Sequence, residues 1–267
     1  MKKALVILFA LLMGMGGTVW AYDNTYAVIV AVADYKNMGP DDGDLTFTIT
    51  DARLFRDFLM SEKGGKVPAS NIVMLLDSQA NKENIIAQSK ALFAKAKKND
   101  RVIFYFSGHG SRGCFVPYDA GDIGNKLLYF NEIKSIFRSA KCNTKLLFAD
   151  ACHSGGMKAG IGASMEDDEN MEAGRKASEN MNIAVMMSCQ GDEVSLESPR
   201  LGQGLFTYYL MEGLGGDANR DGNKYITIQE LYYYVYHKVQ DYAAKCGGSQ
   251  TPLLFGKFDL RLIVGKL

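Results

Sequence analysis

The 267-residue chain has few histidines, cysteines and prolines, and neither sign of charge is in excess. It contains 3 His, 5 Cys and 5 Pro, and its 30 Lys+Arg balance 30 Asp+Glu. So few cysteines exclude a small disulfide-dense scaffold. A formal net charge of zero argues against a nucleic-acid partner bound through a strongly basic surface. Any catalysis that uses a histidine base has only His109, His153 and His237 to draw on.

What the chain does have is ordinary globular composition, with 47% hydrophobic and 22% charged residues, which excludes a disordered protein. The cysteines form no CxxC pair and no Cys/His spacing typical of zinc sites, so we predict no structural metal. Their odd number leaves at least one thiol outside any intrachain disulfide. The sequence specifies neither disulfide pairing nor oligomeric state.

The first 21 residues have the pattern of a secretory signal peptide. Met1-Lys2-Lys3 is basic, residues 4–15 form an apolar run, and Val19-Trp20-Ala21 gives a small-x-small ending. The alternative is a membrane anchor, but the run is shorter than the about 20 residues of a helical membrane span. We therefore predict cleavage after Ala21, export to the periplasm or the medium, and no membrane association afterwards.

The remaining chain alternates between strand and helix patterns. Apolar, β-branched runs predict strands at 26–32, 72–76, 102–106, 145–149 and 183–187, with closing strands within 252–264. Helical patterns begin at Thr50-Asp51 and cover 81–98 (capped by Asn81), 130–140, 204–214 and 227–244. This alternation predicts an α/β fold with a mostly parallel central sheet and helices on both faces.

We expect a single domain, residues 22–267, interrupted by one long connection. Residues 155–182 are rich in glycine, carry the acidic run Glu166-Asp167-Asp168-Glu169 and lack apolar periodicity. A connection of this length is usually functional or disordered. We divide the domain into a large part at about 22–156, a flexible acidic linker at about 157–182 and a small part at about 183–267.

Two of the predicted strands end in residues that suggest chemistry. The third runs into Ser107-Gly108-His109-Gly110, and the fourth runs into Asp150-Ala151-Cys152-His153-Ser154-Gly155. Sites in open α/β sheets form beyond the carboxyl ends of the strands. A thiol needs a base to become a nucleophilic thiolate near neutral pH, and histidine titrates in that range. Each residue alone is more often structural, but together they favour a Cys152–His109 catalytic pair, with the Gly110 and Cys152 backbone N–H groups as an oxyanion hole.

These two motifs resemble the paired signature of the caspase and metacaspase superfamily of cysteine peptidases, especially the bacterial metacaspase-like members. Further similar segments are Asp34-Tyr35, Thr50-Asp51-Ala52, Val116-Pro117-Tyr118-Asp119, Ser188-Cys189-Gln190-Gly191-Asp192-Glu193, Gly204-Leu205-Phe206-Thr207 and Gln250-Thr251-Pro252. The resemblance implies a caspase-like three-layer fold, with His109 as general base and acid and Cys152 as nucleophile. Cys152 would form an acyl-enzyme on a polypeptide substrate and release it to water.

Charge bears on which peptide bond is cut. Asp150 stands two residues before the nucleophile, where true caspases typically have Gln, and Asp51 matches a second acidic pocket residue of metacaspases. A buried carboxylate there favours a cationic side chain and disfavours an acidic one, so we predict cleavage after Arg or Lys. The alternative for Asp51 is a first-turn acid favoured by the helix dipole. For Asp150 the alternative is a strand-end cap.

The linker and two acidic segments raise further possibilities. Lys158, Arg175 and Lys176 could be cut by the enzyme itself, although the linker could equally be an uncut acidic loop. We expect no required cofactor, but the resemblance makes calcium activation possible, with Asp119 and Asp122 as contributors and no full ligand set. Residues 217–222 begin like an EF-hand loop, but Glu230 falls two residues late, which favours a polar turn.

Alternative functions remain open at this level. The chain could be a catalytically silent caspase-fold binding protein, or a thiol hydrolase or transferase acting on a non-peptide acyl group. Of the other candidates, we expect His153 to be structural and His237 to lie on the surface of a helix. Cys189, at the end of the fifth strand, could line the site.

Overall fold

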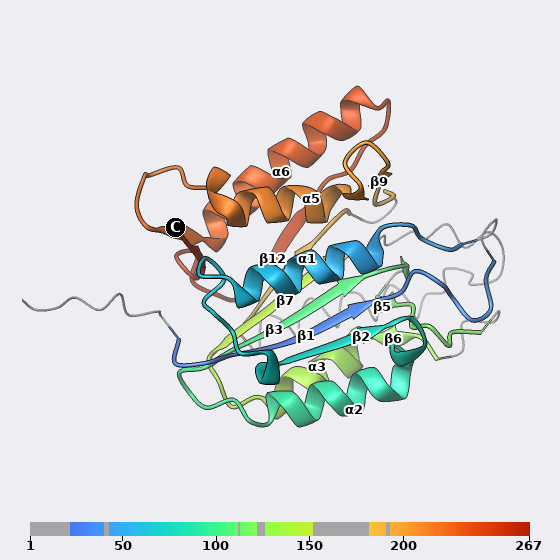
Figure 1. Cartoon of the computed structure of the whole chain (residues 1–267), viewed down its shortest axis with the longest axis horizontal. Helices are drawn as coiled ribbons and strands as arrows, with labels where there is room; N and C mark the ends of the chain where they lie inside the picture. Colours follow the sequence, from blue (N-terminus) through green and yellow to red (C-terminus); the bar gives the residue numbers. More distant parts are fainter. Residues whose placement is uncertain (1–21, 40–42, 112, 122–125, 152–181, 191–192) are drawn as a thin grey trace, which may run out of the picture.

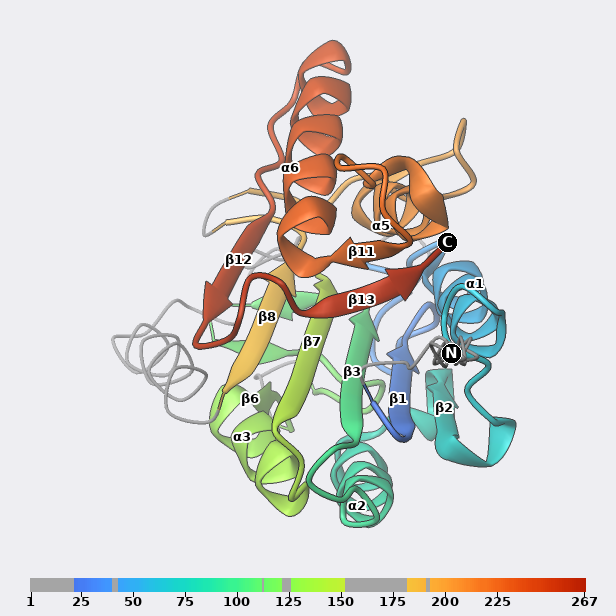
Figure 2. The same cartoon turned by 90° about the vertical axis from the view of Figure 1, so that its left-hand side faces the viewer.

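The computed structural model describes residues 22–39, 43–111, 113–121, 126–151, 182–190 and 193–267. Its centre is a six-stranded sheet in the order β12-β8-β7-β3-β1-β2, which can be followed from left to right in Figure 2. All neighbouring strands are parallel except β12, which runs antiparallel to β8 at one edge. The strands are β1 (Thr25–Ala31), β2 (Ile72–Leu76), β3 (Arg101–Ser107), β7 (Thr144–Asp150), β8 (Ile183–Met187) and β12 (Leu253–Gly256).

Helices cover both faces of this sheet (Figure 1). One face packs on α2 (Lys82–Phe93) and α3 (Phe130–Ser139), and the other on α1 (Thr48–Met60), α5 (Leu205–Glu212) and α6 (Ile228–Lys245). Successive strand residues point to opposite faces, so Phe104 belongs to the first apolar layer and Tyr105 to the second. The predicted three-layer α/β fold is confirmed.

Several short elements complete the fold. Strands β4 (Gly110–Ser111), β5 (Cys114–Phe115) and β6 (Leu128–Tyr129) form a small three-stranded sheet. Strand β9 (Glu197–Ser198) pairs with β10 (Gln203–Gly204). The last pair is β11 (Tyr225–Thr227) with β13 (Ile263–Lys266), and three short helical turns are η1 (Ala69–Asn71), η2 (Asp77–Gln79) and η3 (Gly213–Asp217). The sequence did not predict the two-residue strands, because so few residues show no periodicity.

The predicted strands agree with the observed ones to within a residue or two, but one helix boundary was wrong. Asn81 caps α2 as predicted, accepting a hydrogen bond from the Asn84 N–H at 2.9 Å. The helix nevertheless ends at Phe93 rather than Lys98. The Asp100 carboxylate accepts a hydrogen bond from the Lys97 N–H at 2.7 Å, which turns the chain into β3 before the helix can continue.

Residues 217–223 form a polar turn in front of α6. The side chains of Asn219 and Asp221 accept hydrogen bonds from the N–H groups of Gly222 and Asn223, both at 3.0 Å. Glu230 is used by the helix itself, because it forms a capping box with Thr227. The acidic and amide groups that resemble an EF-hand loop are therefore engaged in local structure.

The described residues contain neither a membrane-spanning helix nor a cluster of metal ligands. None of the helices in that part of the chain has the length and apolar character needed to cross a membrane. No group of three or more His, Cys, Asp or Glu within it could hold a metal ion. Residues 1–21 and nearly all of the proposed linker lie outside the described ranges.

Candidate active site

The central sheet places the two sequence motifs next to each other. Strands β3 and β7 are neighbours, with Ser107 opposite Asp150 at their carboxyl ends. The Gly108 N–H donates to the Asp150 carbonyl at 3.1 Å just beyond the last pair, so the two segments leave the sheet side by side. Cys152 and His153 follow on the β7 side and lie outside the described residues.

His109 is held by the backbone and by one aromatic residue. Its backbone N–H donates to the Tyr35 hydroxyl at 2.6 Å, and the two rings pack with their centroids 4.9 Å apart. The Nε2 atom forms a short hydrogen bond with the Gly43 carbonyl oxygen. Because a carbonyl can only accept, this bond assigns the proton to Nε2 and leaves Nδ1 as the basic nitrogen.

The surroundings of His109 suit a base at neutral pH. Burial lowers the pKa of the imidazole below its usual value, while the hydrogen bond to Gly43 and the charges of Glu197 and Asp44 oppose this change. A ring with a lowered pKa is largely neutral near pH 7 and is able to accept a proton. His109 is only 9% exposed.

A cavity of about 150 Å³ opens beside His109 at the same edge of the sheet. Its lining includes His109, Asp51, Asp150, Ser195, Glu197 and Gly204. Asp51 and Asp150 are 1% and 7% exposed. The structure thus brings three of the sequence-predicted site residues to one cavity, although they are far apart along the chain.

Asp150 ends β7 with its carboxylate surrounded by hydrogen-bond donors. Its Oδ1 atom accepts from the Ser195 hydroxyl at 2.6 Å. Its Oδ2 atom accepts from the Thr207 hydroxyl at 2.8 Å and from the Thr207 N–H at 3.1 Å. The Thr207 hydroxyl also lies 2.7 Å from the Tyr105 hydroxyl, which donates when the threonine proton points to Asp150. These contacts orient the carboxylate, and every donor is neutral.

Asp51 reaches the same point from the first turn of α1. Its carboxylate accepts the Gly204 N–H at 3.1 Å. A Cβ atom built on Gly204 would lie 2.5 Å from the Asp150 Oδ2 atom and 2.8 Å from the Asp51 Oδ2 atom. The two carboxylates therefore meet at a glycine that no other residue could replace without moving them. Sequence reasoning missed this role, because Gly204 was interpreted only as the start of a helix and as part of a segment that resembles the family.

The two acids have no cation among the residues that the structure describes. Burial, and then the charge of Asp150, raise the pKa of Asp51 to about 9. Burial also raises the pKa of Asp150, against the hydrogen bonds from Ser195 and Thr207. Two neighbouring buried carboxylates resist ionising together, so the pair retains a proton that a bound cation could replace.

Two buried polar residues support this site and were not singled out from the sequence. The Ser188 hydroxyl accepts the Ala151 N–H at 3.1 Å and donates to the Ala151 carbonyl at 3.0 Å, which fixes the residue before Cys152. The Gln250 Nε2 group donates to the Ser188 carbonyl at 3.1 Å and to the Ser195 hydroxyl at 3.2 Å. Both residues belong to segments that resemble the family, but only their tertiary contacts reveal what they hold.

The remaining candidates lie away from the cavity or have other partners. Cys189 is buried, with its Sγ atom 3.7 Å from the Ala151 carbonyl oxygen, and it does not line the cavity. His237 is exposed on α6, as predicted, against the ring of Tyr233. Gly110 is buried at the start of β4, directly after His109.

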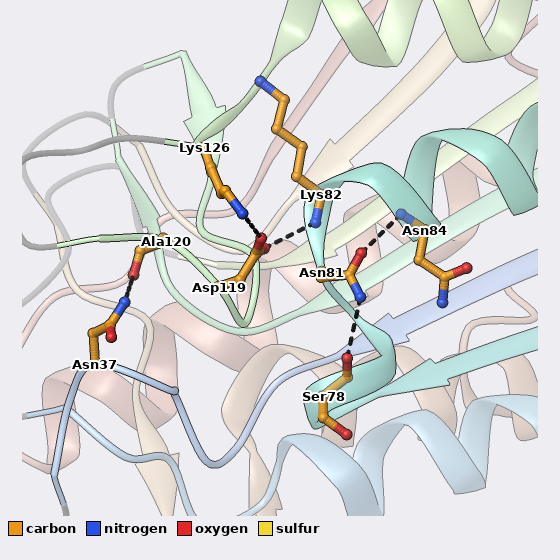
Figure 3. Close-up of polar contacts among 8 residues, drawn as sticks. All are labelled: Asn37, Ser78, Asn81, Lys82, Asn84, Asp119, Ala120 and Lys126. Carbon is orange, nitrogen blue, oxygen red and sulfur yellow. Dashed lines mark hydrogen bonds and ion pairs between the residues drawn. The ribbon is translucent and has the colours of Figure 1, made fainter.

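The acidic residue proposed as a calcium contributor is engaged by the protein itself (Figure 3). The Asp119 Oδ2 atom accepts from the Lys126 ammonium group at 2.8 Å, and Oδ1 accepts the Lys82 N–H at 3.0 Å at the start of α2. Asp122 lies outside the described residues. An ion-paired carboxylate that caps a helix is a poor calcium ligand, so the described residues do not fit such a site.

Comparisons with known proteins identify the family of this chain. A model of the caspase domain family matches residues 24–260. Metacaspase-2 of Arabidopsis thaliana is 27% identical over 222 residues, which cover 70% of this chain and 51% of that protein. Metacaspase-1 of Yarrowia lipolytica is 30% identical over 129 residues, or 40% of this chain and 27% of that protein. A probable protease of a Desulfuromonadales bacterium is 28% identical over 152 residues, or 48% and 18%.

The chain spans about half or less of the length of these curated relatives. Among solved structures, a Geobacter sulfurreducens protein superposes with a TM-score of 0.55 and covers 88% of this chain and 94% of that one. At 14% identity this likeness supports the fold alone.

Proposed function

The chain belongs to the caspase domain family, and on that premise we propose that it is an exported cysteine endopeptidase that cleaves polypeptides after Arg or Lys. One observation carries the proposal. A buried histidine with a free basic nitrogen shares a cavity with two buried carboxylates that have no cation among the described residues. The base supplies the chemistry, and the acids supply the specificity.

In this mechanism, His109 takes the proton of the Cys152 thiol on Nδ1, and the thiolate attacks the carbonyl carbon of the scissile bond. The Gly110 and Cys152 N–H groups stabilise the resulting oxyanion. His109 then gives its proton to the leaving amine, which leaves an acyl-enzyme on Cys152. A water molecule attacks the acyl carbon as His109 takes one of its protons. The intermediate then expels the Cys152 thiolate, and His109 returns the proton to that sulfur as the acid leaves. Ser188 holds Ala151, and with it the segment that carries Cys152.

Specificity follows from the charge of the cavity. A guanidinium or ammonium group entering between Asp51 and Asp150 would take the place of the proton that the pair holds. An acidic side chain would face Asp51, Asp150 and Glu197 and would be repelled. The same pocket would accept Lys158, Arg175 or Lys176, so we also propose self-cleavage within residues 157–182.

Other aspects of the proposal rest on the sequence. The basic and apolar start predicts export, and the neutral charge balance favours no nucleic-acid partner. We propose that the chemistry needs no cofactor. The assays include calcium because the resemblance implies activation by this ion. Against that, both carboxylate oxygens of Asp119 already accept hydrogen bonds within the protein.

The decisive experiment is a panel of peptide reporters that differ only in Arg, Lys or Asp at the cleaved position. The panel is run on residues 22–267 with calcium and with chelator. We expect cleavage of the Arg and Lys reporters, none by Cys152→Ala, and selective labelling of Cys152 by an Arg-based acyloxymethyl ketone. Preferential cleavage after Asp would contradict the specificity. A protein that neither cuts nor is labelled at Cys152 would instead be a caspase-fold binding protein.

Self-cleavage is tested separately. Wild-type protein and Cys152→Ala are incubated at pH 7 and compared by mass. Fragments from the wild type alone would support self-processing after one of the three basic residues, and two intact proteins would not.

A further inference from the structure

In three helices of this protein, a glutamate carboxylate accepts a hydrogen bond from the N–H group just before the first helical residue. In one of them that glutamate is distant in sequence. The first N–H groups of a helix have no intrahelical partner. In α3 and α6, a glutamate three residues into the helix reaches back to the N–H before it. Glu132 accepts the Tyr129 N–H at 3.0 Å, and Glu230 accepts the Thr227 N–H at 2.9 Å.

Helix α1 has no such glutamate. The third residue of α1 is Thr50. Phe47, which directly precedes the helix, makes no capping hydrogen bond with its side chain. The acceptor comes instead from β9, 150 residues away in sequence: the Glu197 Oε1 atom accepts the Phe47 N–H at 2.8 Å. The Oε2 atom accepts the Thr46 N–H at 3.0 Å. One carboxylate therefore caps α1 and also holds the residue before the cap.

The segment that Glu197 holds carries two parts of the site. On its C-terminal side, the first turn of α1 presents Asp51 to the cavity. On its N-terminal side, the Gly43 carbonyl accepts the hydrogen bond that sets the tautomer of His109. The specificity acid and the support of the base therefore lie on one short stretch of chain, residues 43–51.

The first turn also holds a polar group that points to a ligand. Thr48 lines the cavity and is 3% exposed, and its hydroxyl has no hydrogen-bond partner in the described structure. A buried hydroxyl without a partner is costly unless something fills the cavity and bonds to it. The start of α1 is therefore placed to meet a polar substrate group, and its position depends on the cap.

Glu197 also acts through its charge. It lines the cavity together with Asp51 from α1, Asp150 from β7 and His109 from the loop after β3, and Asp44 lies on the segment it holds. Its negative charge contributes to raising the pKa of Asp51 and Asp150, and it opposes the lowering of the pKa of His109 by burial. Loss of this charge would change the titration of the site even if the fold were retained.

We propose that Glu197 is a positioning residue. Its carboxylate fixes residues 43–51, and so keeps the Gly43 carbonyl that supports His109 and the Asp51 carboxylate in place relative to each other. This inference rests on the proposed function and adds a residue to it. Glu197 contacts the segment that carries these groups and need not touch the scissile bond.

The test compares Glu197→Gln with Glu230→Gln as a matched control. Both variants replace a capping carboxylate by an amide, but Glu230 caps α6 and does not line the cavity. We expect Glu197→Gln to lower kcat/KM on the Arg reporter by roughly ten- to a hundredfold, as for loss of a hydrogen bond to a charged group. The acid limb of its pH profile should move to lower pH. Without the negative charge of Glu197, the protonated imidazolium of His109 is less stable, so the pKa of His109 falls. Glu230→Gln should change neither quantity.

Glu197→Asp provides the rescue. It keeps the charge and shortens the side chain by one methylene, so the acid limb should return to its wild-type position while kcat/KM recovers only in part. If Glu197→Gln has wild-type kcat/KM and a wild-type pH profile, the proposal is overturned.

Amide hydrogen exchange separates this inference from the proposed function. The Thr46 and Phe47 amides should exchange faster in Glu197→Gln than in the wild type, and they should be unchanged in Glu230→Gln. If the wild type cleaves no reporter, the proposed function fails, and exchange alone decides whether Glu197 holds the segment. Unchanged exchange at both amides would overturn the inference whatever the activity.

Discussion

The two ends of the central sheet bury ionisable side chains in different surroundings. At the carboxyl end, Asp51, Asp150 and Glu197 face one cavity and form no ion pair within the described residues. At the amino end, the first residue of β3 is Arg101, which is 1% exposed and likewise has no carboxylate partner there. Strand β3 thus begins at a buried cation without an ion-pair partner in the described structure and ends beside buried carboxyl groups that have none there either.

The two ends differ in what surrounds the charge. The Arg101 guanidinium donates to the Thr25 hydroxyl at 3.2 Å and to the Ile263 carbonyl at 3.4 Å, and it lies 4.8 Å from the centroid of the Tyr22 ring. Burial lowers its pKa to about 10. The protein's own groups enclose this cation, whereas the carboxylates at the other end border open space. A buried charge that the fold encloses is structural, whereas one that borders a cavity is placed to meet a ligand.

Neutralising an acid at the cavity should have the largest effect on activity. Asp150→Asn keeps the shape of the side chain and removes its charge. We expect kcat/KM on the Arg reporter to fall by about 100-fold or more, since losing one partner of a buried charge pair costs about 2–5 kcal/mol. A reporter with a neutral residue at the cleaved position should be much less affected. Equal losses on both reporters would show that Asp150 acts on folding rather than on specificity.

Filling the space between the acids should have the next largest effect. A methyl group in Gly204→Ala would lie 2.5 Å from an Asp150 oxygen, so the carboxylates must move. We expect about 1–3 kcal/mol of lost stability, typical of overpacking, and a roughly tenfold loss of Arg cleavage. Gly215→Ala is the control, because its Cβ would meet nothing within 4 Å. Urea unfolding and reporter kinetics on both variants measure the difference.

The third test uses pH to ask whether the acids hold a proton in the free protein. The folded pKa of Asp51 is raised to about 9, and an aspartate in the unfolded chain titrates near 3.9. Its contribution to stability is therefore complete below about pH 3.9 and is lost as pH rises towards 9. Asn cannot lose a proton, so Asp51→Asn should be more stable than the wild type at pH 8, by about 1–3 kcal/mol.

This gain should shrink towards pH 4, and the same variant should cleave Arg reporters poorly. Thermal unfolding between pH 4 and pH 9 measures the stability. If wild type and Asp51→Asn show parallel pH dependence, Asp51 is ionised in the free protein and the pocket holds no exchangeable proton.

The smallest effect is expected at the opposite end of the sheet. Arg101→Met replaces an enclosed cation by an apolar chain of similar length. Such replacements of buried charge are often close to neutral, so we expect a change in unfolding free energy within about 2 kcal/mol. We also expect kcat/KM within twofold of the wild type. A large loss of activity in Arg101→Met, with stability retained, would contradict the view that an enclosed buried charge is only structural.

The sequence was sufficient for the strands of the central sheet and for the residues at their carboxyl ends. Apolar runs such as 102–106 are strands because both faces of the sheet are covered, and that burial is visible in composition alone. His109 was found because it follows such a run between two glycines, and Asp150 because it follows another run and stands two residues before Cys152. Asp51 was found only through its resemblance to a family pocket, since a first-turn acid has an equally good local explanation.

The supporting residues could not be predicted in the same way. Gly204 matters because two side chains from α1 and β7 approach its α-carbon, and Glu197 matters because α1 lacks its own cap. Each role depends on segments that are distant in sequence and close in space. The early end of α2 has a similar origin, because a side chain in the following turn competes with the helix.

Gln250 has a consequence for the order in which this protein is made. It follows α6 in the chain, yet its side chain bonds to Ser188 and Ser195, which hold Ala151 and Asp150. The edge strand β12 follows it immediately and completes the sheet against β8. A nascent chain that has emerged only as far as α6 contains every proposed catalytic residue but lacks the group that links their supports. The order of synthesis therefore delays the assembly of this site until Gln250 has been made.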